Sequence, residues 1–315
     1  MGAPRTAWSH RLDGPITQEL VADGDDIFVI VDGRVHCFDP RGVERWRSAV
    51  GASGPPWVDG DQLLVAGPAG QVLALNRADG LVRATLPSGG SLVGPPFPIE
   101  GAPAWATDSG TVRGAAGWLV QATDSVTHSP ASDGWVYFMP TATAELISGQ
   151  SDRVRWRAVL PGPAPSPPLR GPDSVFTPYA GAQGGPGGVM ALNPDTGMER
   201  WRTPLEGSPV GGLAFGGSVF VGDSEAGVVA LDPATGAVRW SAPVDGSIST
   251  APILSAYGLF VGNADGRVHR FDPDDGGESW SVHLGATVSS GPVVVGDVVV
   301  VGLIDGNLVA IGGER

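Results

Sequence analysis

The chain has little of three things that often reveal a function: cysteine, positive charge and long apolar runs. Its 315 residues contain one cysteine, Cys37, so no intramolecular disulfide can form. Lysine and arginine together number 19 against 33 aspartates and glutamates, which gives a formal net charge of −14. This balance argues against binding to nucleic acids or anionic membranes, which requires clustered positive charge. No apolar run reaches the length of a membrane span, so we expect no membrane insertion.

Other absences narrow the chemistry. The five histidines show no metal-ligand spacing, and no Ser-His-Asp set, P-loop or dinucleotide fingerprint is present. We therefore expect no metal and no cofactor, and the sequence favours a protein without enzymatic activity. The N-terminus also lacks the apolar core of a signal peptide. This favours a cytoplasmic protein, with export and removal of a leader as the alternative.

What the chain has instead is a tryptophan that returns at nearly constant spacing. Ala84 stands where one further tryptophan is due. The series is Trp8, Trp46, Trp118, Trp156, Trp201, Trp240 and Trp280. The steps between these eight positions are 34 to 45 residues, and the step through the chain ends is 43. A period of about 40 residues is typical of a β-propeller, in which each unit is a small four-stranded sheet.

The repeat predicts a single all-β domain over residues 1–315, an eight-bladed propeller of four-stranded antiparallel blades. Its approximate units are 9–46, 47–84, 85–118, 119–156, 157–201, 202–240, 241–280, and 281–315 closed by 1–8. Short β-branched and aromatic runs alternate with Gly, Asp and Asn, the residues of tight hairpin turns. Because the chain begins with what reads as a last strand, we expect the two ends to pair and close the ring.

The tryptophans are most simply packing residues. One large apolar ring per unit can cover the seam, the contact between neighbouring blades. A ladder of ligand-stacking tryptophans is the alternative, but similar residues spread around a ring cannot all face one ligand. We therefore assign the tryptophan series a structural role, with Ala84 as the weak seam.

Two stretches carry a family resemblance. The segments 190–201 (MALNPDTGMERW) and 229–240 (VALDPATGAVRW) resemble the pyrroloquinoline-quinone-type propeller repeat. This repeat is known from quinoprotein alcohol dehydrogenases and from the outer-membrane assembly lipoprotein, and it implies eight blades. The dehydrogenase resemblance implies a vicinal cysteine pair and a Ca²⁺ site, which a chain with one cysteine does not match. The lipoprotein resemblance implies an N-terminal cysteine for acylation, which is also absent.

Candidate site residues come from departures from the repeat. Each blade has a position two residues before the Pro that opens its first strand, and it is small in most units. Gln18 and His128 are the long polar exceptions, and His128 is a candidate acid–base or ligand contact. Trp135 and Tyr137 add aromatic groups nearby in sequence, and Tyr179 begins an enlarged Gly-rich turn, 179–188, that could form a lid. We expect His128, the aromatic residues at 135–138 and the turn 179–188 to share one concavity at the channel mouth, on the side of the third to fifth units, with Gln18 as a separate ligand-binding candidate. Loop exposure and sequence drift explain the same pattern.

Three functions remain open. The first is a non-catalytic, monomeric scaffold that presents its channel mouth or faces to a protein, peptide or small-molecule partner. The second is a cofactor-independent lyase, isomerase or cyclase with His128 as its acid–base. The third is a sensor domain of a larger receptor or kinase.

Overall fold

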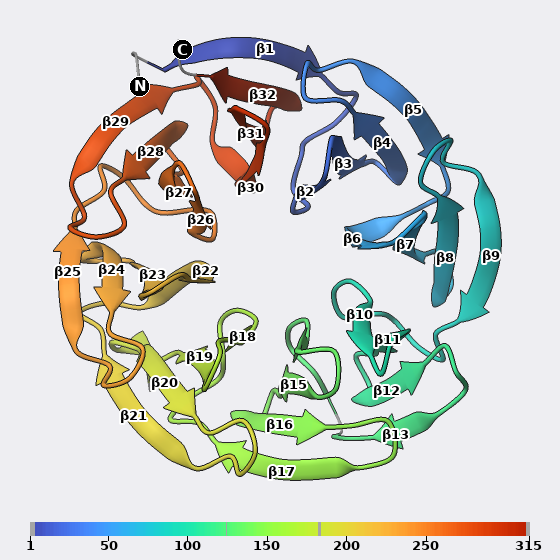
Figure 1. The fold of residues 1–315 in the computed structure, drawn as a ribbon, viewed down its shortest axis with the longest axis vertical. Helices are drawn as coiled ribbons and strands as arrows, with labels where there is room; N and C mark the ends of the chain where they lie inside the picture. Colours follow the sequence, from blue (N-terminus) through green and yellow to red (C-terminus); the bar gives the residue numbers. More distant parts are fainter. Residues whose placement is uncertain (1–3, 124, 182–183, 313–315) are drawn as a thin grey trace. The chain divides into compact units, whose positions relative to one another are not determined.

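The fold is built from β-strands alone. The computed structural model describes residues 4–123, 125–181 and 184–312, and no α-helix occurs within these ranges. Its 32 named strands form eight four-stranded sheets, and every pairing between consecutive strands is antiparallel where its register is given. The sheets are the blades of an eight-bladed β-propeller, which confirms the predicted fold class (Figure 1).

The first four blades follow one another along the chain. Blade 1 contains β2 (Val21–Asp23), β3 (Asp26–Val31), β4 (Arg34–Phe38) and β5 (Glu44–Ala49). Blade 2 contains β6 (Ser53–Asp59), β7 (Gln62–Gly67), β8 (Gln71–Asn76) and β9 (Val82–Pro87). Blade 3 contains β10 (Phe97–Ile99), β11 (Ala102–Ala106), β12 (Thr111–Gly114) and β13 (Leu119–Gln121). Blade 4 contains β14 (Ala131–Ser132), β15 (Tyr137–Pro140), β16 (Glu145–Gly149) and β17 (Val154–Val159).

The last four blades repeat this order until the chain ends meet. Blade 5 contains β18 (Leu169–Arg170), β19 (Val175–Tyr179), β20 (Gly188–Leu192) and β21 (Glu199–Pro204). Blade 6 contains β22 (Pro209–Phe215), β23 (Val219–Asp223), β24 (Gly227–Leu231) and β25 (Val238–Ala242). Blade 7 contains β26 (Ile253–Ser255), β27 (Gly258–Gly262), β28 (Arg267–Phe271) and β29 (Glu278–His283). Blade 8 contains β30 (Val288–Val295), β31 (Val298–Leu303), β32 (Asn307–Gly312) and the N-terminal β1 (Arg5–Arg11).

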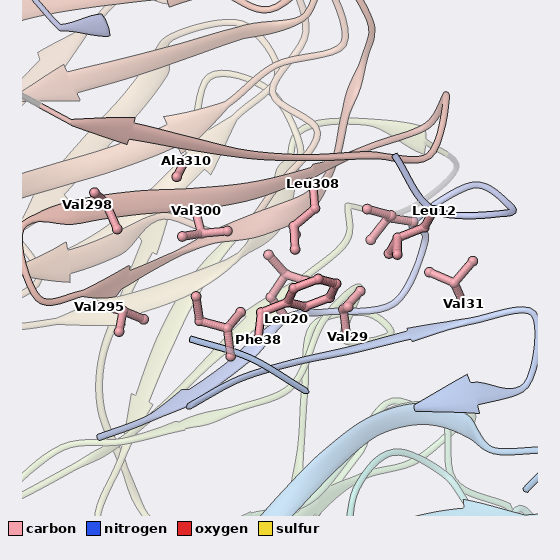
Figure 2. Close-up of a cluster of buried hydrophobic side chains, with 12 residues drawn as sticks. Leu12, Leu20, Val29, Val31, Phe38, Val295, Val298, Val300, Leu308 and Ala310 are labelled. Atoms are coloured by element: carbon pink, nitrogen blue, oxygen red, sulfur yellow. The ribbon is translucent and has the colours of Figure 1, made fainter. Parts of the chain in front are cut away.

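Blade 8 unites the two ends of the chain. Its outer strand β1 pairs with β32 from Arg5 opposite Gly312 to Arg11 opposite Asn307, which confirms that the terminal strands close the fold (Figure 1). Behind this pairing lies an apolar cluster shared by blades 8 and 1 (Figure 2). Phe38 of blade 1 and Val300 of blade 8 are both fully buried within it. Burial of this surface favours the paired termini over an open edge.

Local turn chemistry explains where the third strand of a blade gives way to the fourth. Asp232 Oδ1 accepts the backbone N–H groups of Ala234 and Thr235 at 3.0 and 2.9 Å. Asn193 makes the equivalent pair of bonds in blade 5. Gly236 then adopts a φ of +74°, a conformation that glycine reaches without steric cost. These turns precede Trp201 and Trp240, the tryptophans of their blades.

The chain divides into two compact units. The first takes in the segments up to Pro68, Val72–Thr85 and from Ala242 onward; the second takes in Ala69–Gln71 and Leu86–Ser241. In the first unit the opening strands β26, β30, β2 and β6 contact one another in that order. In the second, β10, β14, β18 and β22 do the same. The single-domain organisation of residues 1–315 stays a prediction.

Candidate functional site

His128 lies just before β14, on the approach to the first strand of blade 4. The side chain is half-buried, and its Nδ1 is buried without a hydrogen-bond partner in the described structure. Burial lowers the pKa of the imidazole, because removal from water disfavours the charged form. His128 therefore does not lie free in bulk solvent, and its neutral form is favoured.

Equivalent positions in blades 7 and 8 show what this place in the repeat normally does. Thr250 Oγ1 accepts the N–H of Gly262 at 2.8 Å, and Ser290 Oγ accepts the N–H of Leu20 at 3.0 Å. Both hydroxyl residues are buried, so this position serves packing rather than an open surface. The sequence offers one reason for the unpartnered nitrogen of His128. Leu20, the donor to Ser290, lies in the blade that follows Ser290. The equivalent residue in the blade that follows His128 is Pro168, which has no N–H to donate.

Trp135 lies at the other end of the same hairpin. Val126 pairs with Thr141 and Ser132 pairs with Tyr137, so residue 128 and the β14–β15 turn are at opposite ends of the strand pair. Trp135 occupies that turn, and 66% of it is exposed. His128 and Trp135 are therefore not brought together, although one blade carries both.

The turn that carries Trp135 is held by hydrogen bonds within itself and by contacts with both neighbouring blades. Asp133 Oδ1 accepts the N–H groups of Trp135 and Val136 at 3.0 and 2.9 Å. Asp133 Oδ2 also pairs with Arg170 Nε of blade 5 at 3.3 Å. On the other side, Glu100 of blade 3 donates its N–H to Gly134 O at 2.6 Å. The exposed indole thus projects from a fixed backbone.

The two candidate tyrosines, Tyr137 and Tyr179, are packing residues of different seams. Tyr137 is fully buried in the cluster shared by blades 3 and 4, and its ring centroid is 6.1 Å from that of Phe97. Burial raises the pKa of its phenol, whose oxygen has no hydrogen-bond partner in the described structure. Tyr179 is buried in the cluster of blades 4 and 5, and burial raises its pKa as well. Neither tyrosine lies beside Trp135 on an exposed surface.

The remaining candidates are Gln18 and the enlarged turn 179–188. Gln18 is half-buried and belongs to the first unit, whereas His128 belongs to the second. The enlarged turn separates β19 from β20, and residues 182–183 of the proposed lid lie outside the described residues. Within the described residues, no cluster of three or more His, Cys, Asp or Glu side chains has the geometry of a metal site.

The tryptophans of the repeat make one recurring contact with the next blade. The indole N–H donates to a backbone carbonyl in that blade's third turn at 2.8 to 2.9 Å. The pairs are Trp8 with Pro40, Trp46 with Arg77, Trp156 with Pro194, and Trp201 with Pro233. Trp240 and Trp280 each lie near a phenylalanine of their own blade, Phe220 and Phe260, with ring centroids 5.8 and 5.9 Å apart. These contacts support a structural role for the series.

Blade 3, and β9 of blade 2, depart from this arrangement. Trp118 packs on Gly114 of its own blade, where an added Cβ would lie 2.2 Å from the indole. Ala84 on β9 is exposed. The fully buried tryptophan of this region is instead Trp105 on β11, whose indole N–H donates to Ser88 O at 3.3 Å. The spacing rule did not identify Trp105, because it lies outside the repeated turn motif.

An ionic cluster spans blades 1 and 2. Asp26 is buried and accepts from Arg77 Nε at 2.7 Å and from Arg45. Arg77 also reaches Asp23. Asp26, Arg45 and Arg77 border a cleft of about 420 Å³. Beneath them, Cys37 is fully buried with its Sγ 3.7 Å from Asp26 Oδ1. Burial and the Asp26 carboxylate raise the pKa of Cys37 to about 12, so the thiol is not a reactive nucleophile.

Comparison with known proteins adds the family. The sequence profile of a family described as outer membrane protein assembly factor BamB matches residues 4–83, 31–114 and 185–314. None of the curated protein sequences compared with the chain matches it. The described residues contain no helix long and apolar enough to cross a membrane.

Solved structures share the fold at low identity. BamB from Moraxella catarrhalis is 16% identical, with a TM-score of 0.75 over 100% of this chain and 99% of that one. Sqt1 from Saccharomyces cerevisiae is 12% identical, with a TM-score of 0.80 over the full length of both chains. Quinohemoprotein alcohol dehydrogenase from Comamonas testosteroni is 12% identical, with a TM-score of 0.71 over 99% of this chain and 77% of that one. At these identities the likeness shows the fold alone.

Proposed function

The chain belongs to the family of the outer membrane protein assembly factor BamB, and from this premise we propose that it is a non-catalytic scaffold for a protein or peptide partner. The family description names a factor that acts in the assembly of other proteins. In this chain the partner would bind at the face that carries the β14–β15 turn, with Trp135 as the central contact. A surface, rather than the fold as such, would carry this function, because propellers serve many purposes.

The observation that carries the proposal is the braced, exposed indole of Trp135. An aromatic side chain buries roughly 150–250 Å² when covered, and two-thirds of this one is still available. At roughly 25 cal/mol per Å², covering it would contribute about 3 kcal/mol to association. The hydrogen bonds of Asp133 and Gly134 hold the turn in place before binding, which lowers the entropy cost of ordering it.

The composition of the surface also favours a partner of particular chemistry. Tryptophan and arginine are enriched among the residues that dominate binding energy in protein interfaces. Arg170 is next to the Trp135 turn, because it forms an ion pair with Asp133 of that turn. The net charge of −14 favours a neutral or basic partner surface, since like charges slow association.

Site-specific photo-crosslinking tests the proposal. A photoreactive residue is placed at Trp135 and, as a matched control, at Val159 on the outer strand of the same blade, which is 75% exposed. We expect crosslinks to a defined partner from position 135 only, and competition by the unmodified protein. With that partner purified, Trp135→Ala should weaken binding at least tenfold while Val159→Ala changes it less than twofold. Equal crosslinking from both positions, or unchanged affinity of Trp135→Ala, would contradict the proposal.

A second candidate, a cofactor-independent enzyme with His128 as acid–base, is favoured by the unpartnered Nδ1 and the lowered pKa of the imidazole. A substrate for this site would have to reach the imidazole. Addition of an accessible-histidine reagent such as diethyl pyrocarbonate should then modify His128 in the folded protein, as detected by peptide mass analysis. Protection of His128 until the protein unfolds would exclude this function.

A further inference from the structure

The third residue of the third strand is polar in only three blades. In blade 1 it is His36, whose Nδ1 is 2.7 Å from Glu44 Oε1. In blade 7 it is His269, whose Nδ1 is 2.9 Å from Glu278 Oε1. Both histidines are buried, and each is paired with a glutamate of its own blade.

Blade 3 has Arg113 at this position without the matching acid. In blade 1 the chain runs eight residues between Cys37 and Trp46, the pair that faces across strands three and four. In blade 3 only three residues separate Gly114 from Trp118, whose backbone groups make the equivalent pairing. The shortened turn omits the segment that holds Glu44 in blade 1. The residue opposite Arg113 on β13 is Leu119.

Arg113 consequently has an unmatched charge. Its Nε is buried and has no acceptor, and no carboxylate among the described residues forms an ion pair with it. The guanidinium lies over Gly89, where an added Cβ would be 3.1 Å from one of its terminal nitrogens. Gly89 has a φ of +82°, so both conformation and space favour glycine beneath the cation. The side chain as a whole is half-buried, which leaves part of it open to a ligand.

We propose that Arg113 binds a small oxyanion, a carboxylate or a phosphate, which takes the place of the glutamate present in blades 1 and 7. A half-buried cation without a counter-charge is costly, and an unsatisfied buried N–H in a folded protein calls for an ion, water or partner group. The planar guanidinium fork matches the two oxygens of a carboxylate or phosphate. This site is separate from the Trp135 surface and does not depend on its function.

Denaturant unfolding at constant ionic strength tests the site, with sodium chloride replaced stepwise by sodium phosphate or by sodium acetate. If the folded protein binds the anion with a dissociation constant of about 5 mM, 50 mM anion would raise the folded-to-unfolded ratio about elevenfold. Arg113→Gln should lose this response. Arg153→Gln, which removes an exposed arginine paired only with its neighbour Asp152, should keep it.

A second variant supplies the anion from within the chain. Leu119 is 51% exposed and directly opposite Arg113, so its side chain shares that face of the sheet. Leu119→Glu should therefore raise the unfolding midpoint in chloride buffer and remove the response to added anion. The matched double variant, Leu119→Glu with Arg113→Gln, should show neither effect.

The two anions distinguish the chemistry of the ligand. A response to phosphate alone assigns a phosphate site, and a response to both assigns a general oxyanion site that an acidic side chain could also fill. An equal response in the protein and in Arg113→Gln would overturn the proposal, as would no response to either anion at 50 mM. A Leu119→Glu variant that still responds fully to phosphate would overturn it as well.

Discussion

Replacement of Trp201 by alanine should strongly destabilise the fold. Trp201 on β21 is 8% exposed, and its indole N–H donates to Pro233 O of blade 6 at 2.9 Å. Its ring packs on Gly236, where an added Cβ would lie only 2.5 Å from the indole, and on Phe176 at a centroid distance of 5.8 Å. Truncation of a buried tryptophan costs about 3–5 kcal/mol, since it removes apolar contacts and leaves a cavity. Loss of the hydrogen bond is part of this cost, at about 1 kcal/mol.

Urea unfolding followed by far-ultraviolet circular dichroism measures this effect without relying on tryptophan fluorescence. Trp201→Ala should lower the free energy of unfolding by about 4 kcal/mol, and Trp201→Phe should lower it by about half as much because part of the ring remains. Trp135→Ala is the matched control, since it deletes an exposed indole and should change stability by less than about 0.5 kcal/mol. If Trp201→Ala and Trp135→Ala unfold at the same urea concentration, the seam role of the tryptophan series is refuted.

Three further predictions concern the ionic cluster of blades 1 and 2 and the Cys37 thiol beneath it. Asp26→Ala should lower the free energy of unfolding, measured in urea, by about 2–3 kcal/mol, because it leaves Arg77 without its buried partner. Asp61→Ala, which removes an exposed acid nearby, is the control. If Asp26→Ala loses no more stability than Asp61→Ala, the ionic cluster does not stabilise the fold. The Cys37 thiol should resist a thiolate-selective reagent at pH 8 in the folded protein and react rapidly in urea, since its folded pKa is about 12. Because this pKa is raised on folding, its contribution to stability is complete below the ordinary thiol pKa of about 9 and is lost as the pH rises towards 12. Fast labelling of the folded protein at pH 8 would show that the thiol is accessible.

Local sequence chemistry was sufficient to predict the fold. The turns around Asn193 and Asp232 fix their own hydrogen bonds, because the side chain and the backbone groups it binds are two or three residues apart. The spacing of the tryptophans then counted the blades, since each unit must bury one apolar face against the next. The pairing of β1 with β32 followed from the same count, because the chain begins with the fourth strand of the last blade.

The candidate site was harder to predict, because exposure is decided by neighbours far away in sequence. Trp135 and Tyr137 are two residues apart, yet one is 66% exposed and the other fully buried. The aromatic pattern alone could not separate them, since a turn residue and a strand residue of similar apolarity look alike in sequence. The register of β14 with β15 also placed His128 and Trp135 at opposite ends of a hairpin, against the expectation of one shared concavity.

The sequence by itself determined the class and number of blades, the turn geometry and the strand that joins the two ends, because these depend on short-range spacing and on residues that act within a few positions of one another. Only the tertiary structure decided which polar groups are left without partners. Arg113 reads as one more scattered arginine until its strand is aligned with those of His36 and His269, and until its Nε is found buried with no acceptor. The physical reason is that a charge is satisfied or unsatisfied by groups brought near it through packing, and a sequence of repeats does not state which of those groups a shortened turn has removed.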